Sequence, residues 1–178
     1  MKKIDKLIID ADIARCVSEK EIPVSTNSRK LLNIMLKNRL IFVRNSQLNE
    51  EWKKHASRYA KTWLISMISR RLVQVVHDDD TFSNLIDKMD LSDKEKAAGK
   101  KDCHLISAAT ISDAIIASND AIAFNVFQKA SSINGKFGVL YWISPTRNVD
   151  EAEEILIANS AIPNHWLISC KEHHCTAV

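Results

Sequence analysis

The chain has 178 residues, of which 46% are hydrophobic and 26% are charged, and its formal net charge is +3 at pH 7. This composition excludes disorder as the main state and suits one domain with a single substantial core. The mild positive charge permits a nucleic-acid partner but does not by itself indicate one.

The N-terminal segment predicts a short strand that ends in an acid. Residues 6–9 are a short apolar run, Asp10 follows, and the pattern after Asp12 predicts a helix over residues 12–21 before Pro23. The first apolar run is too short for a signal peptide, and no segment is long enough to span a membrane. We therefore expect a cytoplasmic protein with reduced cysteines.

The next elements are a helix over residues 27–38, a strand over 40–43 and a long helix over 46–70. Apolar side chains recur along the long helix at spacings of four and three residues, which is typical of a helix packed on a core. This apolar stripe consists of Leu48, Trp52, Ala56, Tyr59, Trp63 and Met67.

Two adjacent glutamates on the long helix point in different directions. Glu50 lies roughly 150° from the centre of the apolar stripe, whereas Glu51 lies roughly 110° away, at its border. An acid that shares a site with strand ends must lie near the core, so we favour Glu51. His55 and Arg58 follow the same border, and Lys54 lies on the remaining face. All three are candidates for phosphate contact or simply part of a solvated face.

An acid in the middle of a later helix is harder to explain by packing. Residues 72–76 predict a strand or an extended connection, and Ser92 followed by Glu95 is a capping-box signature. The helix that this box begins carries Asp102 within its apolar stripe rather than on its wet face. The neighbours of Asp102 on that stripe are Ala98, Leu105, Ile106 and Ala109.

Strands and helices alternate to the end of the chain. Residues 114–117 predict a strand, 120–131 a helix, 139–143 a strand and 150–159 a last helix. This alternation predicts an α/β fold, with a parallel sheet covered by helices on both faces.

Three aspartates point to one site. Asp10 and Asp120 each follow a strand, and ligand sites in open parallel sheets gather at the carboxyl ends of strands. Both could instead cap the helices that follow them. Capping does not explain Asp102, which lies inside a helix, so acids brought to one place suggest a metal or phosphate site.

The order of the acids resembles that of PIN-domain nucleases. The family has an Asp at the end of the first strand, matched by Asp10, and a Glu on a helix after the second strand, matched by Glu51. It then has an Asp followed by helical hydrophobic and small residues, matched by Asp102, and a Thr/Ser-x-Asp after the fourth strand, matched by Ser118-Asn119-Asp120. The resemblance covers about residues 4–145.

The resemblance implies a three-layer α/β/α sandwich with a short parallel central sheet. Residues 1–145 would form the PIN-like domain. Residues 146–178 lie outside the resemblance, and we expect them to add a C-terminal helix and tail packed on the same domain. Asp10, Glu51, Asp102 and Asp120 would be the catalytic acids that hold Mg²⁺ or Mn²⁺, since these ions prefer oxygen ligands.

The implied activity is endoribonuclease cleavage of RNA that leaves a 5′-phosphate. Ser118, Asn119 and Asp12 would contact the substrate, together with Lys54, His55 and Arg58. The implied roles are a toxin of a toxin–antitoxin pair, a defence nuclease or an RNA-processing enzyme. An antitoxin protein or a second copy of the chain would be a partner.

Other interpretations stay open. Asp10-Ala11-Asp12 also resembles the D-x-D of haloacid-dehalogenase-type phosphatases, which leaves Glu51 and Asp102 without a role. A PIN-like module could also bind RNA or a protein without cutting. The tail holds residues of the types that bind metals, and their spacing matches no closed zinc pattern. These residues are Cys170, His173, His174 and Cys175.

Overall fold

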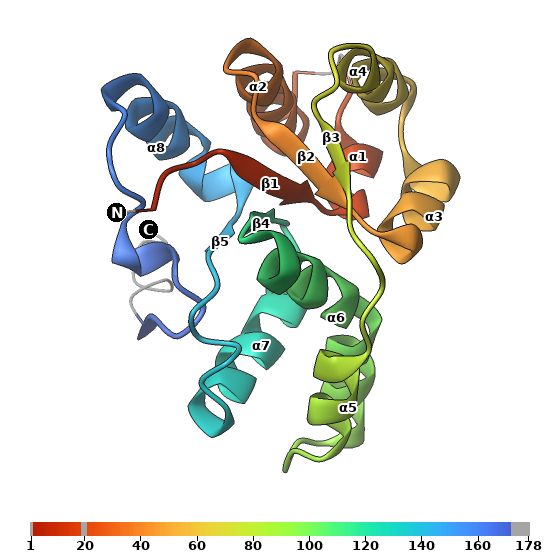
Figure 1. The fold of residues 1–178 in the computed structure, drawn as a ribbon, viewed down its shortest axis with the longest axis vertical. Helices are drawn as coiled ribbons and strands as arrows, with labels where there is room; N and C mark the ends of the chain where they lie inside the picture. The colour runs from red at the N-terminus through yellow and green to blue at the C-terminus, as the bar shows by residue number, and fades with distance from the viewer. Residues whose placement is uncertain (1, 19–20, 172–178) are drawn as a thin grey trace.

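A five-stranded parallel sheet forms the centre of the molecule, in the order β3-β2-β1-β4-β5. The computed structural model describes residues 2–18 and 21–171. The strands are β1 (Lys6–Ile9), β2 (Ile41–Arg44), β3 (Val73–Val75), β4 (Ile115–Ala117) and β5 (Trp142–Ile143). Because helices flank this sheet on both sides, the predicted α/β class with a short parallel sheet is confirmed (Figure 1).

The helices form two layers, one on each side of the sheet (Figure 1). One layer contains α1 (Ala11–Cys16), α2 (Pro23–Lys37), α4 (Arg58–Ser69) and α8 (Pro145–Ala158), with α3 (Ser46–His55) at its end. The other contains α5 (Thr81–Asp87), α6 (Asp93–Ser112) and α7 (Ala121–Ile133). A short 3-10 helix, Asn164–Trp166, follows α8.

The central strand β1 and its neighbour β4 end at the same level. Leu7 pairs with Ile115 and Ile9 pairs with Ala117, and all four side chains are buried. The Asp10 amide donates to the Ala117 carbonyl at 3.0 Å, which continues the ladder by one residue. The strand order reverses between β1 and β4, and such a switch point is where open α/β sheets bind ligands.

The prediction of a single long helix over residues 46–70 is wrong, because two separate helices, α3 and α4, form there. Ser57 is extended and caps α4, since its hydroxyl accepts from the Ala60 amide at 3.1 Å. Its own amide donates to the Ala14 carbonyl of α1 at 2.9 Å. The apolar stripe survives the break, since Trp52 and Trp63 pack at 5.9 Å between ring centroids.

Several element boundaries also differ from the prediction. α2 begins at Pro23 and α8 begins at Pro145, because proline suits the first turn of a helix, where an amide hydrogen is not needed. β5 is shorter than predicted, and α5 was not predicted. α8 packs on α2, where Lys30 pairs with Asp150 at 2.6 Å. None of the helices described here combines the length and apolar character needed to cross a membrane.

Candidate active site

A cleft with a volume of about 280 Å³ opens at the carboxyl ends of β1 and β4. All four predicted catalytic acids line it, and so do Asp12 and His55. Its lining consists of Asp10, Ala11, Asp12, Arg15, Glu51, His55, Lys101, Asp102 and Asp120. The structure therefore brings together acids from four separate segments of the chain.

Asp10 ends β1 and is only 6% exposed. Although it stands at the N-cap position of α1, its side chain makes no capping hydrogen bond. Its Oδ2 instead accepts a hydrogen bond from the Ser118 hydroxyl at 2.7 Å. Burial raises the pKa of Asp10, and the Ser118 bond only partly offsets that effect. The capping interpretation thus fails for this side chain.

Asp120 does cap a helix and also lines the cleft. Its Oδ1 accepts from the amides of Ile122 and Ala123, each at 2.9 Å, at the start of α7. Its own amide donates to the Ser118 hydroxyl at 3.0 Å. Ser118 is buried behind the cleft and links Asp120 to Asp10.

Asp12 and Asn119 hold the first turn of α1 against the end of β4. Oδ2 of Asp12 accepts from the Asn119 amide at 2.9 Å. Its Oδ1 is buried and has no hydrogen-bond partner within the described part of the chain. Burial, reinforced by the charge of Asp10, raises the pKa of Asp12 to about 7. Asn119 itself faces a neighbouring hollow, where its Oδ1 accepts from the hydroxyls of Ser144 and Thr146.

Asp102 projects into the cleft from the middle of α6 and is 5% exposed. Burial, with the negative charge of Asp10, raises its pKa to about 7. The Nζ atom of Lys101 lies 3.8 Å from Oδ1 of Asp102, and the Lys101 side chain is 70% exposed, so it neutralises this carboxylate weakly. The apolar stripe on which the sequence placed Asp102 is the face that α6 turns toward the sheet.

The structure places Glu51 in the cleft and Glu50 outside it. Oε2 of Glu51 lies 3.4 Å from Nε2 of His104, and Oε1 lies 3.4 Å from Nε2 of Gln47. Partial burial raises the pKa of Glu51, but the contacts with His104 and Gln47 outweigh it and lower the pKa overall. Glu50 instead pairs with Lys53 on the outer side of α3.

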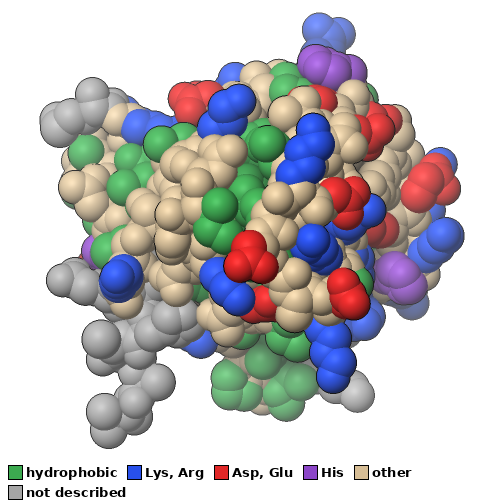
Figure 2. All heavy atoms as spheres, turned by 90° about the horizontal axis from the view of Figure 1, so that it is seen from below, with side chains coloured by type: hydrophobic (Ala, Val, Ile, Leu, Met, Phe, Trp, Pro, Cys, Tyr) green, Lys and Arg blue, Asp and Glu red, His purple; other side chains and the backbone are tan. Residues whose placement is uncertain are grey.

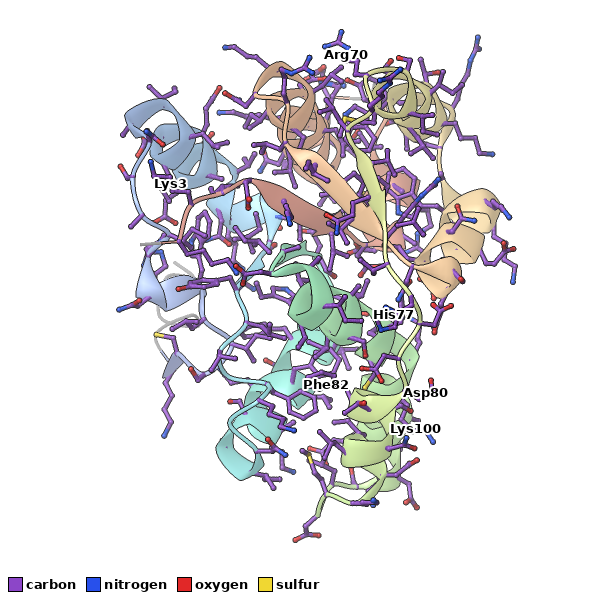
Figure 3. The ribbon with its side chains drawn as sticks, in the orientation of Figure 1. Lys3, Arg70, His77, Asp80, Phe82 and Lys100 are labelled. Atoms are coloured by element: carbon purple, nitrogen blue, oxygen red, sulfur yellow. The ribbon has the colours of Figure 1, made fainter. Side chains whose placement is uncertain are left out.

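A second hollow of about 390 Å³ lies beside the cleft, where β3 leads into α5. Asp80, which precedes α5, and Lys100 of α6 line it, and Figure 3 shows both on the same side of the molecule as His77. Two of its acids have structural partners: Asp78 accepts from the Ser46 amide, and Asp79 accepts from the Thr81 amide and hydroxyl. This hollow is larger than the cleft, but the predicted acids lie in the smaller one.

The cationic side chains in the cleft wall are not the predicted ones. Arg15 and Lys101 line the cleft, whereas Lys54 and Arg58 do not. The break between α3 and α4 ends the surface stripe that would have carried Arg58. Arg15 follows Asp12 by three residues on α1, and residues at that spacing share a helix face, so the sequence held a usable signal. Elsewhere, on the face seen in Figure 2, acidic and basic side chains are mixed.

The residues of the cleft fit a hard divalent cation. In the described ranges, no three His, Cys, Asp or Glu side chains converge into a ready-made cage. Mg²⁺ needs only one or two carboxylates, with waters completing its shell. Oδ1 of Asp12 has no partner among the described residues, and burial raises the pKa of Asp10 and of Asp102, so a cation would stabilise the charged forms of these carboxylates. His173, His174 and Cys175 of the tail lie outside the described residues.

Comparisons with family models, with curated proteins and with solved structures each gave no match. The resemblance to PIN domains consequently stays a prediction from the order of the acids.

Proposed function

We propose that this protein is a metal-dependent endoribonuclease of the PIN-like kind, acting at the acidic cleft. One observation supports the proposal above all. Five carboxylates line a single cleft at the switch point of the sheet, with Arg15 and Lys101 in its wall. Carboxylates suit a divalent cation, and the cationic wall suits the phosphates of a polynucleotide.

Asp10, Glu51, Asp102 and Asp120 would hold Mg²⁺ or Mn²⁺. When bound, such an ion polarises a phosphodiester and favours the ionisation of a water molecule. The protein contributes fixed ligand positions. Ser118 holds one oxygen of Asp10, and the first amides of α7 hold one oxygen of Asp120. Both carboxylates would therefore bind a cation with little further loss of conformational entropy.

The buried acids also supply the reason for a cation to bind. Asp10 and Asp102 are almost fully buried, and the charge of Asp10 helps to raise the pKa of Asp102. Carboxylates crowded in this way repel each other unless a proton or a cation lies among them. A divalent ion held by Asp10 and Asp102 would take the place of the protons and relieve this repulsion.

The cleft wall would guide the nucleic-acid backbone. Arg15, His55 and Lys101 are exposed side chains around the acids, and phosphate contacts of this kind position a strand without reading its sequence. RNA as the substrate comes from the resemblance, as do a cytoplasmic location and an antitoxin or second copy as partner.

The direct test is cleavage of a fluorescent single-stranded RNA by the purified protein. We expect internal cleavage with Mg²⁺ or Mn²⁺, none with excess chelator, and none for Asp102→Asn with either ion. Cleavage that survives thorough chelation contradicts the proposal. Release of phosphate from a small phosphomonoester, with no cleavage of RNA, replaces it with the phosphatase that uses Asp10 and Asp12.

A further inference from the structure

A narrow hollow adjoins the acidic cleft at the carboxyl ends of β4 and β5. Asp120 lines both, so a nucleotide with its phosphate in the cleft has the hollow beside it. We infer that the hollow binds the carbonyl edge of one nucleobase of the RNA, with uracil and guanine preferred over cytosine and adenine. This assignment rests on the proposed function and adds a base preference to it.

The hollow lies where α7 and α8 begin on opposite sides of the sheet (Figure 1). Its apolar wall is formed by Phe124 of α7 and Trp142 of β5, whose ring centroids are 5.9 Å apart. Both rings are almost fully buried, so they leave little surface on which a base could stack. The volume is about 30 Å³, which is room for roughly two water-sized atoms and not for a whole base. The hollow therefore suits the protruding carbonyl edge of a base.

The side-chain amide of Asn119 contains a donor that lacks an acceptor. Its Oδ1 accepts from the hydroxyls of Ser144 and Thr146 at 2.7 and 2.8 Å, and the Thr146 amide lies 3.4 Å from the same oxygen. A backbone amide can only donate, which assigns the oxygen of Asn119 to that side. Nδ2 is buried, and no described residue accepts a hydrogen bond from it. Because an unpaired buried donor is costly, an acceptor that enters the hollow lined by Asn119 would be stabilised there.

The other polar side chains of the hollow also offer donors. Oδ1 of Asn148 accepts from the Ser144 amide at 3.0 Å, which leaves its Nδ2 group as a donor. Arg147 is exposed beside the hollow, and its guanidinium group carries only donors. The Ser118 hydroxyl already donates one hydrogen bond and accepts another inside the protein. A lining that offers mainly donors favours a ligand edge that offers acceptors. Side chains at binding sites commonly change rotamer on binding, so the donors need not be uncovered beforehand.

Nucleobases differ in what their edges present to such a lining. Uracil presents the acceptor O4 and guanine the acceptors O6 and N7, whereas cytosine and adenine place an amino donor at the corresponding position. An amino group facing the donors of Asn119 and Asn148 would leave polar groups unpaired, and such mismatches discriminate strongly between ligands. A phosphate suits the hollow less well, because Phe124, Trp142 and the carboxylate of Asp120 line it.

The test compares two RNA oligonucleotides, oligo(U) and oligo(C), which share ring size and backbone and differ in the keto or amino group at position 4. We expect wild-type protein with Mn²⁺ to cut oligo(U) with a kcat/KM at least about fivefold higher than that for oligo(C). In an RNA of random sequence, the fragment ends should show U and G enriched over C and A at one position beside the cut. Fluorescence anisotropy with chelated protein should show tighter binding of oligo(U) than of oligo(C).

Asn119→Asp and Asn148→Asp test whether the preference comes from the hollow. Each change keeps the oxygen that is used inside the protein and replaces the Nδ2 donor with an acceptor. We expect the kcat/KM for oligo(U) divided by that for oligo(C) to fall to about one or below in each variant. This ratio cancels any general effect of the added charge. Asn125→Asp is the matched control, because Asn125 is exposed on α7 and lines neither the hollow nor the cleft. It should keep the wild-type ratio.

The outcomes distinguish the base assignment from the proposed function. Equal cleavage of oligo(U) and oligo(C), with no preferred base beside the cut, overturns the base assignment and leaves the proposed function standing. A preference that persists in both Asn119→Asp and Asn148→Asp, or that changes equally in Asn125→Asp, also overturns the assignment, because the base would then be read elsewhere. Tighter binding of oligo(U) that Asn119→Asp removes, without cleavage in Mg²⁺ or Mn²⁺, supports the hollow and overturns the proposed function. Protein that neither binds nor cuts RNA overturns both.

Discussion

The hydroxyl of Ser118 donates to Oδ2 of Asp10 across 2.7 Å and joins the ends of two neighbouring strands. The same hydroxyl oxygen accepts from the Asp120 amide at 3.0 Å, so one buried serine serves two acids of the cleft. Two partners that share one buried atom are left unsatisfied together when it is removed.

Ser118→Ala should therefore lower stability and activity together. It leaves a buried carboxylate oxygen and an amide without partners, which we expect to cost about 1–3 kcal/mol of unfolding free energy. Denaturant titration of chelated protein measures this cost. Ser132→Ala is the matched control, because its long bond to the Gln128 carbonyl lies on the exposed face of α7. Its expected effect is within about 0.5 kcal/mol. Equal effects of the two changes would contradict a special role for Ser118.

Asp102→Asn should abolish cleavage without destabilising the chelated protein. The pKa of Asp102 is raised to about 7 by burial and by Asp10, so its charge is unfavourable in the folded state. Removing that charge should leave the melting temperature unchanged or higher. Excess Mg²⁺ should raise the melting temperature of the wild type more than that of the variant, since a ligand that binds only the native state stabilises that state. A variant that melts well below the wild type without metal, yet cuts RNA, would remove Asp102 from the site.

The same pKa shift predicts a pH dependence with a definite sign. The folded pKa of about 7 lies above the ordinary value of 3.8, so the folded state binds more protons than the unfolded state between those two values. The ionisation of Asp102 should thus lower the stability of the chelated wild type as the pH rises from about 4 to about 7. Above that range Asp102 should cause no further decrease. The melting temperature of Asp102→Asn minus that of the wild type should accordingly increase with pH over this range. Asp12, also raised to about 7, adds the same trend to both proteins.

The neighbouring glutamates give a sharp comparison of activity. Glu51→Gln removes a carboxylate from the cleft and should reduce RNA cleavage by orders of magnitude. Glu50→Gln removes an identical charge one residue away, where the carboxylate pairs with exposed Lys53, and should change the rate little. Single-turnover cleavage at saturating Mn²⁺ measures both. Loss of activity in Glu50→Gln alone would show that the second hollow, which Glu50 lines, holds the chemistry.

The sequence predicted the parts of the cleft that depend on local periodicity. The phase of α6 located Asp102, and the phase of α3 separated Glu51 from Glu50, because apolar spacing fixes which side of a helix faces the core. Periodicity could not predict the break after His55, since no glycine or proline marks it and the apolar stripe continues across it. A long-range bond from Ser57 to Ala14 holds that break. The contact of His104 with Glu51 was missed for a similar reason, because the two residues lie on different helices.

The break between α3 and α4 leads to a last prediction about which cations guide RNA. Arg15 and Lys101 line the cleft, while Lys54 and Arg58 do not. Arg15→Gln with Lys101→Gln should weaken binding of single-stranded RNA to chelated protein. It should also reduce the slope of log K against log salt by roughly 0.7 for each phosphate that the protein no longer neutralises. Lys54→Gln with Arg58→Gln removes the same net charge, so any effect of overall charge appears equally in both proteins. Fluorescence anisotropy at several salt concentrations measures both slopes. Equal weakening in the two double variants would mean that RNA is attracted by the general surface charge and does not follow the cleft.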